Sequence, residues 1–431
     1  MSQKVLVLDL THGGEVLCSE YRKSGAEVTA VDIYHTATPE LTGSLAAEGI
    51  RVLDTAPAED FDLAVAPIHC PERLLGAARC GRVISHHEAV GELARFDVPV
   101  IEVTGARAKT SACHVLAHIL QSQGRRVLLH TSRGLAMIAD GERILLRHKV
   151  SIAPASILTL SKERHDADVV IAEVSLGGTG VGDVSVVTTI GDNYGIAANT
   201  RKAFDGKVQM VSGAKANVVF PEAERDLWRP HVPPEVGITT FGPSGDVDVA
   251  LPKAIELGHG AKLDVVTKER CYHARLPGTF LAASYTTAIS SALAAASSLG
   301  VGLEEATASL SKFKGVPGRG ELIREAGCYA IRERNPGVSA GSIDWNIKVL
   351  EEVYGQDDIG LVLDPVSQKV CEKLDLDDVN RALASRPSVK GRYIINMPGI
   401  NRNADFRRIG SFHEVRGKHR LMVYCTKEGY L

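Results

Sequence analysis

Residues 276–321 read LPGTFLAASYTTAISSALAAASSLGVGLEEATASLSKFKGVPGRGE, and they carry the most specific pattern in the chain. Its middle part, from Ser284 to Leu299, is rich in alanine and serine and almost free of charge. Such a composition predicts a single helix that is buried on all sides. The stretch closes a folded unit that opens at PVIEVTG, residues 99–105, and ends near Gly320.

The segments on either side of this unit alternate short strands with helices. Before it come the apolar runs KVLVLDL, AEVTAVDI, IRVLDTA, DLAVAPI and GRVISH, and after Cys328 come IGLVLD, GRYIINM and RLMVYCT. This alternation is typical of α/β domains with mostly parallel sheets. We predict three domains, at residues 1–98, 99–325 and 326–431. The first and third are expected to be Rossmann-like.

Composition restricts the class of protein. The chain has 431 residues, a net charge of −3 and no long block of like charge, which argues against nucleic acid as a partner. No apolar stretch approaches the ~20 residues that span a membrane, and the N-terminal run is too short for a signal peptide. The eight cysteines form no CxxC pair, so we expect reduced thiols in a cytoplasmic protein. The sequence does not predict the oligomeric state.

A phosphate-binding loop is predicted at residues 100–111, VIEVTGARAKTS, where an apolar strand runs through small residues into a helix. Backbone N–H groups at such a helix start bind the anion, the lysine reaches the terminal phosphates, and a hydroxyl holds Mg²⁺. The residues expected to contact ATP are Gly105, Ala106, Arg107, Ala108, Lys109, Thr110 and Ser111. Ala108 replaces the usual glycine, which costs on the order of 1 kcal/mol if φ is positive there. An ordinary turn with a solvated lysine is the alternative.

The second half of such a site needs an acid at the end of a neighbouring strand. The run DVVIAEVSL supplies Glu173, which could hold Mg²⁺ against the phosphates together with Thr110. The glycines of residues 177–182 would let the backbone approach a ligand closely. A glutamate that simply faces solvent at a strand end is the alternative.

The order of these segments resembles the Mur ligases. Members of that family carry a nucleotide-loop lysine, a magnesium glutamate, LPG before an alanine-rich helix, and then LGV and FKGVPGRGE. The resemblance implies a three-domain architecture with a central phosphate-loop ATPase domain. It also implies an ATP-dependent ligase that turns a carboxylate into an acyl phosphate before a nucleophile attacks. Closure of the third domain would keep water away from the acyl phosphate.

The family's functional residues can be carried over to matching positions. The resemblance implies catalytic roles for Lys109, Glu173 and Arg319, the last of which would contact nucleotide from the domain hinge. Asn335 matches the Asn-Pro pair that opens the third domain's first helix, and it would also contact nucleotide. Lys202 and Lys207 are the candidates for the lysine that many members carry as a carbamate.

Several family motifs are altered. The usual Asp-His after the family's TNI-like strand is replaced by Asp192, Asn193 and Tyr194. The segment after LPG lacks asparagine, and Ile331 stands where the family has a ribose-binding aspartate. These changes put a peptidoglycan substrate in doubt.

The strings THGG, HCP, TTIGDNYG and RERNPGVS, and the final YCTKEGYL, resemble an archaeal branch of the family that completes the nickel coenzyme F-430 in methanogens. That branch activates a propionate of a nickel tetrapyrrole with ATP and closes a carbocyclic ring by attack of a ring-associated carbon. The resemblance therefore implies a polyanionic nickel tetrapyrrole as the small-molecule substrate, with ADP and phosphate released.

Candidate substrate contacts come from histidines at strand ends, where open α/β sheets bind ligands. They could line a pocket or approach nickel as axial ligands, and nearby arginines could meet the substrate's carboxylates. The candidates are His12, Gly13, His69, His86, His87, Arg332 and Arg334. Solvated loop histidines and a solvated charge run are the alternatives.

Three other functions compete with this interpretation. The first strand and Asp32 would suit a dinucleotide-binding regulator or dehydrogenase, but THGGE at residues 11–15 is not a GxGxxG fingerprint. A nucleotide-hydrolysing binding protein would explain Lys109 and Glu173 but not the third domain. A ligase that joins a carboxylate to an amino acid as an amide is the nearest rival.

Overall fold

The computed structural model describes residues 2–148, 150–163, 166–191, 195–197, 199–365, 374–395 and 405–427. The chain divides into two compact units: Met1–Cys113 with Gln123–Phe241, and His114–Ser122 with Gly242–Leu431. The mixed α/β class predicted from the sequence is confirmed by the elements of both units. No described helix combines the length and the apolarity needed to cross a membrane.

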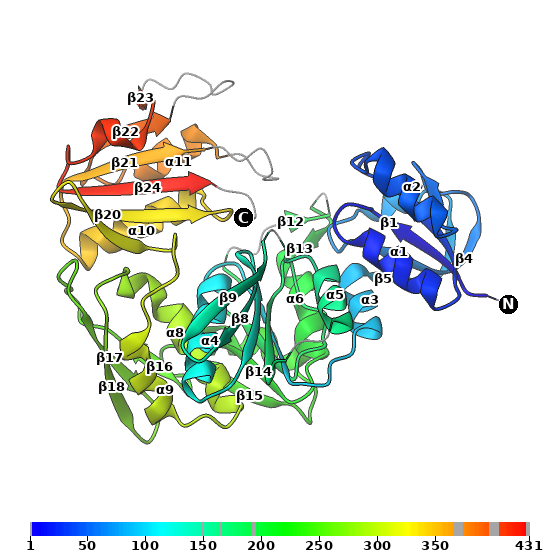
Figure 1. The fold of residues 1–431 in the computed structure, drawn as a ribbon, viewed down its shortest axis with the longest axis horizontal. Helices are drawn as coiled ribbons and strands as arrows, with labels where there is room; N and C mark the ends of the chain where they lie inside the picture. The colour runs from blue at the N-terminus through cyan, green and yellow to red at the C-terminus, as the bar shows by residue number, and fades with distance from the viewer. Residues whose placement is uncertain are drawn as a thin grey trace. The chain divides into compact units, whose positions relative to one another are not determined.

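The N-terminal sheet of the first unit, to which β1, β4 and β5 in Figure 1 belong, is parallel and has the strand order β3-β2-β1-β4-β5. Its strands are β1 (Lys4–Leu8), β2 (Glu27–Val31), β3 (Arg51–Leu53), β4 (Asp60–Ala66) and β5 (Arg79–Ser85). Helices α1 (Gly14–Lys23), α2 (Pro39–Ala47) and α3 (His86–Leu93) connect or follow them. The chain leaves β1 toward β2 on one side and returns to β4 on the other. The carboxyl ends of β1 and β4 therefore flank a topological switch point, where such sheets bind ligands.

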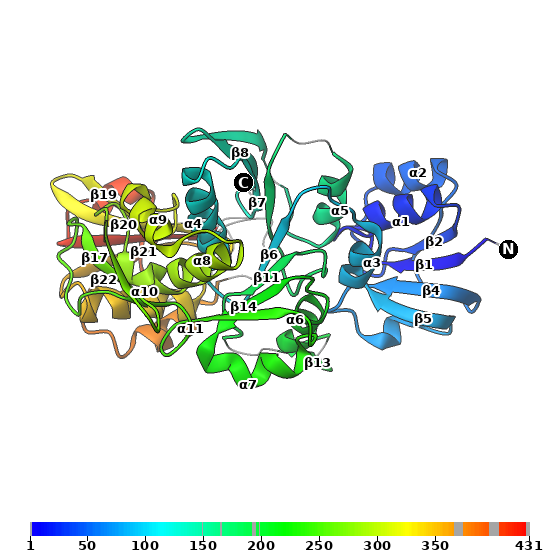
Figure 2. The same cartoon turned by 90° about the horizontal axis from the view of Figure 1, so that it is seen from below.

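The central sheet of the same unit has the order β15-β14-β11-β6-β10-β7-β8-β9, and β6, β11 and β14 lie side by side in Figure 2. Its strands are β6 (Val100–Thr104), β7 (Val127–Thr131), β8 (Gly134–Ala139), β9 (Glu142–Arg147), β10 (Val169–Glu173), β11 (Val184–Val187), β14 (Asn217–Pro221) and β15 (Gly237–Phe241). The strands from β15 to β7 are parallel, and β8 and β9 extend them as an antiparallel hairpin. Further elements are α4 (Lys109–Ser122), α5 (Ala155–Lys162), α6 (Ala203–Ser212), α7 (Arg225–Trp228) and the short pair β12 (Gly195–Ile196) and β13 (Arg201–Lys202).

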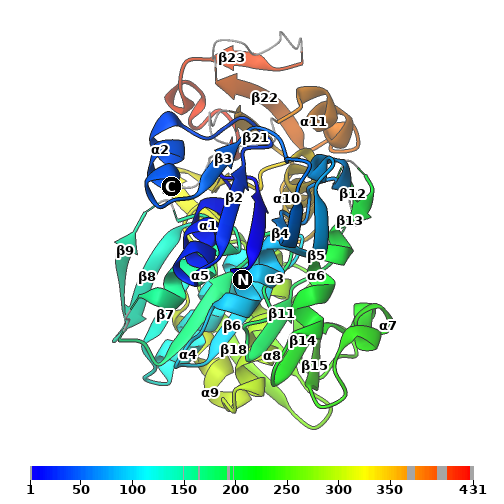
Figure 3. The same cartoon turned by 90° about the vertical axis from the view of Figure 1, so that its right-hand side faces the viewer.

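One hydrophobic core joins the N-terminal and central sheets. Helices α1, α3 and α5 pack against one another (Figure 3). The core cluster contains Val5 and Leu63 of the N-terminal sheet, Ile157 of α5 and Val170 of the central sheet. Because buried apolar area is the main source of stability, this shared core ties the ends of the two sheets together within the unit.

The second unit contains the alanine-rich helix and two further sheets. Helix α8 (Thr286–Ser298) has residues 288–296 all buried, so the predicted buried helix is confirmed. Helix α9 (Leu303–Ser309) follows it, beside the small antiparallel sheet of β16 (Asp248–Ala250), β17 (Ala261–Val266) and β18 (Cys271–Leu276). The prediction of mostly parallel sheets does not hold for this small sheet, whose strands alternate buried and exposed residues.

The C-terminal sheet has the order β19-β20-β24-β21-β22-β23 and is parallel except between β19 and β20 (Figure 1). Its elements are β19 (Glu321–Glu325), β20 (Cys328–Asn335), α10 (Ala340–Glu352), β21 (Ile359–Asp364), α11 (Leu376–Leu383), β22 (Val389–Ile395), β23 (Arg407–Ile409) and β24 (Leu421–Lys427). Short 3₁₀ turns lie at Glu72–Leu75, Glu222–Glu224, Arg229–His231, Ala282–Tyr285, Leu310–Lys312 and Phe412–Val415. The three predicted domain boundaries stay a prediction.

Candidate active site

The predicted phosphate loop lies between β6 and α4 and has an unusual backbone. Gly105 has φ 142°, and a Cβ there would lie 2.0 Å from Thr188 Oγ1, so only glycine fits. Ala108 has φ 63°, which is the left-handed conformation that alanine adopts at a cost of about 1–2 kcal/mol. The Lys109 Nζ donates to the carbonyl of Gly105 at 3.0 Å. The loop is therefore strained at Ala108, and its lysine lies over the turn, as a lysine that binds phosphate would.

A buried carboxylate and two hydroxyls meet at the start of α4. The Thr110 Oγ1 donates to Glu173 Oε2 at 2.9 Å, and the backbone N–H of Ser132 donates to the same oxygen at 3.1 Å. The hydroxyls of Ser132 and Thr110 are 3.2 Å apart. Oxygen donors of this kind fit Mg²⁺. The structure thus brings Thr110 and Glu173 together as predicted and adds Ser132, which follows β7 and was not predicted.

A second buried carboxylate lies on the adjacent strand. Glu102, in the middle of β6, accepts from Thr179 N at 2.9 Å, Thr179 Oγ1 at 2.7 Å and Gly180 N at 2.9 Å. Burial raises the pKa of this carboxyl group, although these hydrogen bonds oppose the shift. A Cβ at Gly177 would lie 1.9 Å from the carbonyl oxygen of Gly206 in α6. The glycine-rich run of residues 177–182 therefore packs closely against α6. Its Thr179 and Gly180 hold the run to Glu102 by hydrogen bonds.

The two candidate carbamate lysines have different surroundings. Lys202 is exposed on the short strand β13. Lys207, in α6, is 1% exposed, and its Nζ donates to the carbonyl of Ala203 at 3.1 Å. Burial and, to a smaller extent, the nearby charge of Lys109 lower the pKa of Lys207 to about 8. Since CO₂ reacts with the neutral amine, Lys207 is the better candidate.

Two of the candidate histidines line the switch point of the N-terminal sheet. His12 follows β1, and its Nδ1 lies 2.7 Å from Oδ2 of Asp9. His69 follows β4, with its ring centroid 6.0 Å from that of His12 and the two rings perpendicular. Tyr34, which was not predicted, stacks on His69 with an interplanar angle of 11° and a centroid distance of 6.1 Å. The three rings form what we call the aromatic cluster.

The aspartate behind His12 is buried and backbone-strained. Asp9 has φ 69° and a fully buried side chain, which also accepts from the N–H and hydroxyl of Thr11. Burial alone would raise the pKa of Asp9, but the hydrogen bonds from His12 and Thr11 outweigh it and lower the pKa. The same bond to Asp9 raises the pKa of His12, whereas burial lowers the pKa of His69.

The other two histidines and Gly13 lie within the packing of the unit. His86 and His87 open α3 and are 2% and 3% exposed. The His86 Nε2 is 2.9 Å from the carbonyl oxygen of Leu8, the His87 Nε2 is 3.0 Å from that of Ser175, and burial lowers both pKa values to about 4. A Cβ at Gly13 would lie 2.4 Å from the Ala155 Cβ. The four histidines therefore form two pairs, one near solvent and one in the core.

Two candidates of the second unit, Arg319 and Asn335, lie near the partly buried carboxylate of Glu333. Glu333, in β20, accepts from Gly320 N at 2.7 Å and Asn335 Nδ2 at 3.2 Å. Burial raises its pKa to about 7, and the charge of Arg319 opposes the rise. The Tyr285 hydroxyl donates to the Arg319 carbonyl at 2.9 Å and so supports the GVPGR turn. Glu333 was not predicted as a site residue.

Of the other predicted residues, some are exposed at the surface and some lie outside the residues that the structure describes. Arg332 and Arg334 are exposed on β20. Asp192, Asn193 and Tyr194, the replacements for the family's Asp-His, lie outside the described residues, as does the end of YCTKEGYL.

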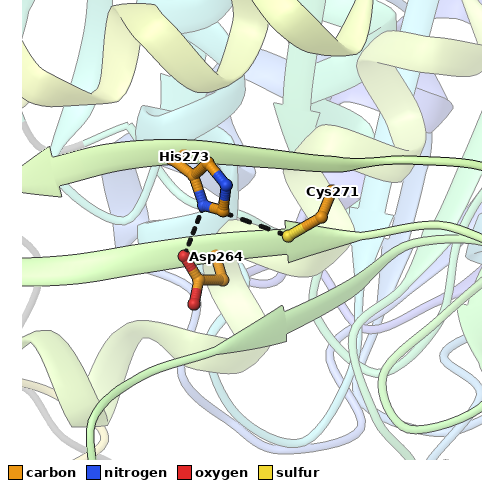
Figure 4. Close-up of side chains that lie close together, drawn as sticks. All are labelled: Asp264, Cys271 and His273. Atoms are coloured by element: carbon orange, nitrogen blue, oxygen red, sulfur yellow. Dashed lines mark hydrogen bonds and ion pairs between the residues drawn. The ribbon is translucent and has the colours of Figure 1, made fainter.

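An exposed Asp-His pair lies in the small sheet, with a cysteine beside it (Figure 4). The His273 Nδ1 is 2.6 Å from Asp264 Oδ1 and 4.0 Å from the Cys271 Sγ. Lys262 also contacts Asp264, with its Nζ at 3.1 Å from Oδ1. Because the carboxylate is already neutralised and the imidazole nitrogen is already hydrogen-bonded, we assign no metal to this group.

Comparison with known proteins settles the family. No family model matches the chain. The chain is 33% identical over 426 residues to the coenzyme F(430) synthetase of Methanosarcina acetivorans, which covers 91% of this chain and 89% of that protein. The chain belongs to the coenzyme F(430) synthetase family. This membership confirms the predicted resemblance and the predicted class of enzyme, an ATP-dependent ligase.

Solved structures show that this member of the family has the Mur-ligase fold. A UDP-N-acetylmuramoylalanyl-D-glutamyl-2,6-diaminopimelate–D-alanyl-D-alanyl ligase from Acinetobacter baumannii matches with a TM-score of 0.59 at 16% identity, over 99% of this chain and 90% of that one. A MurF ligase from Thermotoga maritima, in complex with ADP, matches with a TM-score of 0.58 at 14% identity, over 96% and 95% of the two chains. The predicted Mur-ligase architecture is thus confirmed.

Proposed function

We propose that this enzyme completes coenzyme F-430 by closing a carbocyclic ring on a nickel tetrapyrrole. ATP would convert one propionate of the substrate to an acyl phosphate, a ring-associated carbon would attack it, and ADP and phosphate would be released. The observation that supports this most is the grouping of Lys109, Thr110 and Glu173 in a member of the coenzyme F(430) synthetase family. A reaction that uses ATP also fits the expected cytoplasmic location.

The described residues suggest how the chain would bind ATP. The loop Gly105–Ser111 would surround the phosphates, and Lys109 would leave its bond to Gly105 O for the terminal phosphate. Thr110 and Glu173, already in contact, would hold Mg²⁺, which would neutralise charge on the phosphates. The family resemblance implies nucleotide contacts for Arg319 and Asn335, and these roles stay predictions from the sequence. A carbamate on Lys207 would add a negative charge close to Lys109.

The aromatic cluster is the proposed contact for the tetrapyrrole in the first unit. His12, Tyr34 and His69 present ring faces and edges at a switch point, and a flat conjugated macrocycle suits such surfaces. Arg332 and Arg334 stay candidates for the substrate's carboxylates. His86 and His87 stay candidates from the sequence, but their imidazoles are buried and face backbone carbonyls.

Phosphate release with two sets of substrates tests this function. The protein would be incubated with ATP and Mg²⁺, and then with either the ring-opened nickel tetrapyrrole acid or a mixture of amino acids. We expect phosphate release and a change of the visible spectrum with the tetrapyrrole alone. Release that needs a free amino acid, with no spectral change, would support the amide-forming ligase instead.

A further inference from the structure

The Asp9–His12 pair has the geometry of an oriented base. The Asp9 carboxylate is fixed by three donors, two of them from Thr11, and its Oδ2 lies 2.7 Å from the His12 Nδ1. This contact places the ring proton on Nδ1 and leaves Nε2 as the basic nitrogen. The His12 side chain is 46% exposed, and the described residues include no hydrogen-bond partner for Nε2. A buried carboxylate that orients an accessible imidazole is the usual arrangement of a general base.

The position of His12 is suited to a planar substrate. It follows β1 at the switch point, opposite His69, which follows the neighbouring strand β4. Tyr34 and His69 are nearly parallel to each other, and His12 stands perpendicular to both, with angles of 87° and 90°. A flat ligand stacked on Tyr34 or His69 would therefore be perpendicular to the His12 ring.

A short series of contacts connects His12 with the proposed magnesium carboxylate in the same unit. Gly13, next to His12, packs against Ala155 at the start of α5. Just before α5, the carbonyl of Ile152 accepts from the N–H and hydroxyl of Ser175 at 2.9 and 3.1 Å. Ser175 comes two residues after Glu173. The turn that carries His12 is thus fixed relative to the end of β10, where the ATP phosphates are proposed to bind.

We propose that His12 is the general base of the ring closure and that Asp9 is its positioning residue. This rests on the proposed function. In the step, the C–H bond of the attacking carbon and the acyl C–O bond break, and a C–C bond forms between the attacking and acyl carbons. Phosphate leaves with the electron pair of the C–O bond, and the proton goes to His12 Nε2 and from there to water. No oxidant or further reactant is needed.

A trap for the acyl phosphate separates this role from the ATP chemistry. Hydroxylamine converts an acyl phosphate to a hydroxamate, which can be measured beside the closed ring. For His12→Gln we expect ring closure to fall by about 10²–10⁴-fold, the usual effect of removing a general base. With saturating tetrapyrrole, hydroxamate should still form, so the ratio of closed ring to hydroxamate should fall by that factor. Lys109→Ala should form neither product.

Two further variants distinguish a base from a merely structural side chain. Asp9→Asn should lower the ratio of closed ring to hydroxamate, because the amide cannot fix the same tautomer. His12→Ala should regain closure with added imidazole, which a purely structural role would not allow. The control is His273→Gln, which breaks the exposed Asp264–His273 pair and should leave both products unchanged.

Three outcomes would overturn the proposal. Ring closure by His12→Gln within about threefold of wild type would exclude His12 as the base. Equal loss of hydroxamate and closure would make His12 a binding residue, and a shifted visible spectrum of the bound tetrapyrrole in that variant would make it a nickel ligand. Absence of hydroxamate from the wild-type enzyme with the nickel substrate would instead defeat the proposed function itself.

Discussion

Glu102 and Glu173 are buried glutamates on neighbouring parallel strands of one sheet, yet their surroundings differ. Glu102 lies in the middle of β6, where Thr179 and Gly180 donate to both of its oxygens. Glu173 is the last residue of β10, and its Oε2 accepts from Thr110 and Ser132, which lie at a helix start and at another strand end. Both carboxylates are almost completely removed from water.

Position along the strand separates the two carboxylates: Glu102 lies in mid-strand, and Glu173 lies at the strand end where we propose that Mg²⁺ binds. The donors of Glu102 belong to a loop that packs on α6, so the carboxylate anchors protein to protein. The donors of Glu173 include a hydroxyl that is itself a ligand type for Mg²⁺. A buried carboxylate with a structural role is stabilised by fixed hydrogen-bond donors. A carboxylate that binds a ligand or metal is expected at the carboxyl ends of parallel strands, where ligands bind in such sheets.

Lys109→Ala, next to Thr110 in the phosphate loop, should lower activity most. Loss of a cation that faces developing phosphate charge should lower activity by at least about 10²–10³-fold. The measurement is ADP release with the nickel tetrapyrrole, and Lys23→Ala, at the exposed end of α1, is the control with little expected change. Activity of Lys109→Ala within about tenfold of wild type would show that this loop does not bind the phosphates.

Glu173→Gln should cause the second-largest loss of activity, because it should weaken the binding of Mg²⁺. The amide keeps an oxygen for the Thr110 hydroxyl but loses the negative charge that a hard cation needs. We expect activity to fall by about 10²-fold or more, the size of effect seen when one electrostatic contact to the transition state is lost. A higher Mg²⁺ concentration for half activation should accompany the loss. An unchanged Mg²⁺ titration would place the ion elsewhere.

The same comparison shows how far the sequence predicts the site. Glu173 ends one apolar strand, and Lys109 and Thr110 follow another after a short loop. Period and order alone therefore place them at one edge of a parallel sheet. Ser132 joins them through the register of β7 with β10, which a local pattern does not contain. The glutamate within VIEVT gave no signal either, because its donors come from residues 179–180, far along the chain.

The fold, like the site, has elements that the sequence predicts and elements that it does not. The five strands of the N-terminal sheet and the buried helix α8 were predictable, because their apolar runs are continuous and bounded by turns. The small sheet of β16, β17 and β18 was not, since its strands are short and lack a continuous apolar run, and they pair only with one another. Tyr34 in the aromatic cluster was missed for the same reason as Ser132: it meets His12 and His69 through the tertiary fold.

Glu102→Gln should affect stability and leave the chemistry intact. The amide nitrogen would face a backbone N–H of the loop at residues 179–180, and an unsatisfied buried pair of donors costs about 1–3 kcal/mol. Thermal or urea unfolding should show this loss, while the Mg²⁺ dependence of the folded enzyme stays that of wild type. A changed Mg²⁺ titration in Glu102→Gln would remove the distinction between the two glutamates.

The smallest effect is expected for Ala108→Gly, in the turn that carries Lys109. Ala108 has φ 63°, and glycine adopts this conformation without the steric cost that alanine meets. Glycine also has more freedom in the unfolded chain, so the net gain in the free energy of unfolding should be only about 0.5–1 kcal/mol.

The control is Ala308→Gly, on the exposed side of α9, which should instead lose about 0.5–1 kcal/mol of the free energy of unfolding. Because the loop already holds its shape, activity should change by less than about threefold, a difference well below the typical effect of losing a charge contact. Opposite signs of the two stability changes would attribute the strain to the loop backbone, whereas equal losses would mean that Ala108 contributes contacts that outweigh its positive φ.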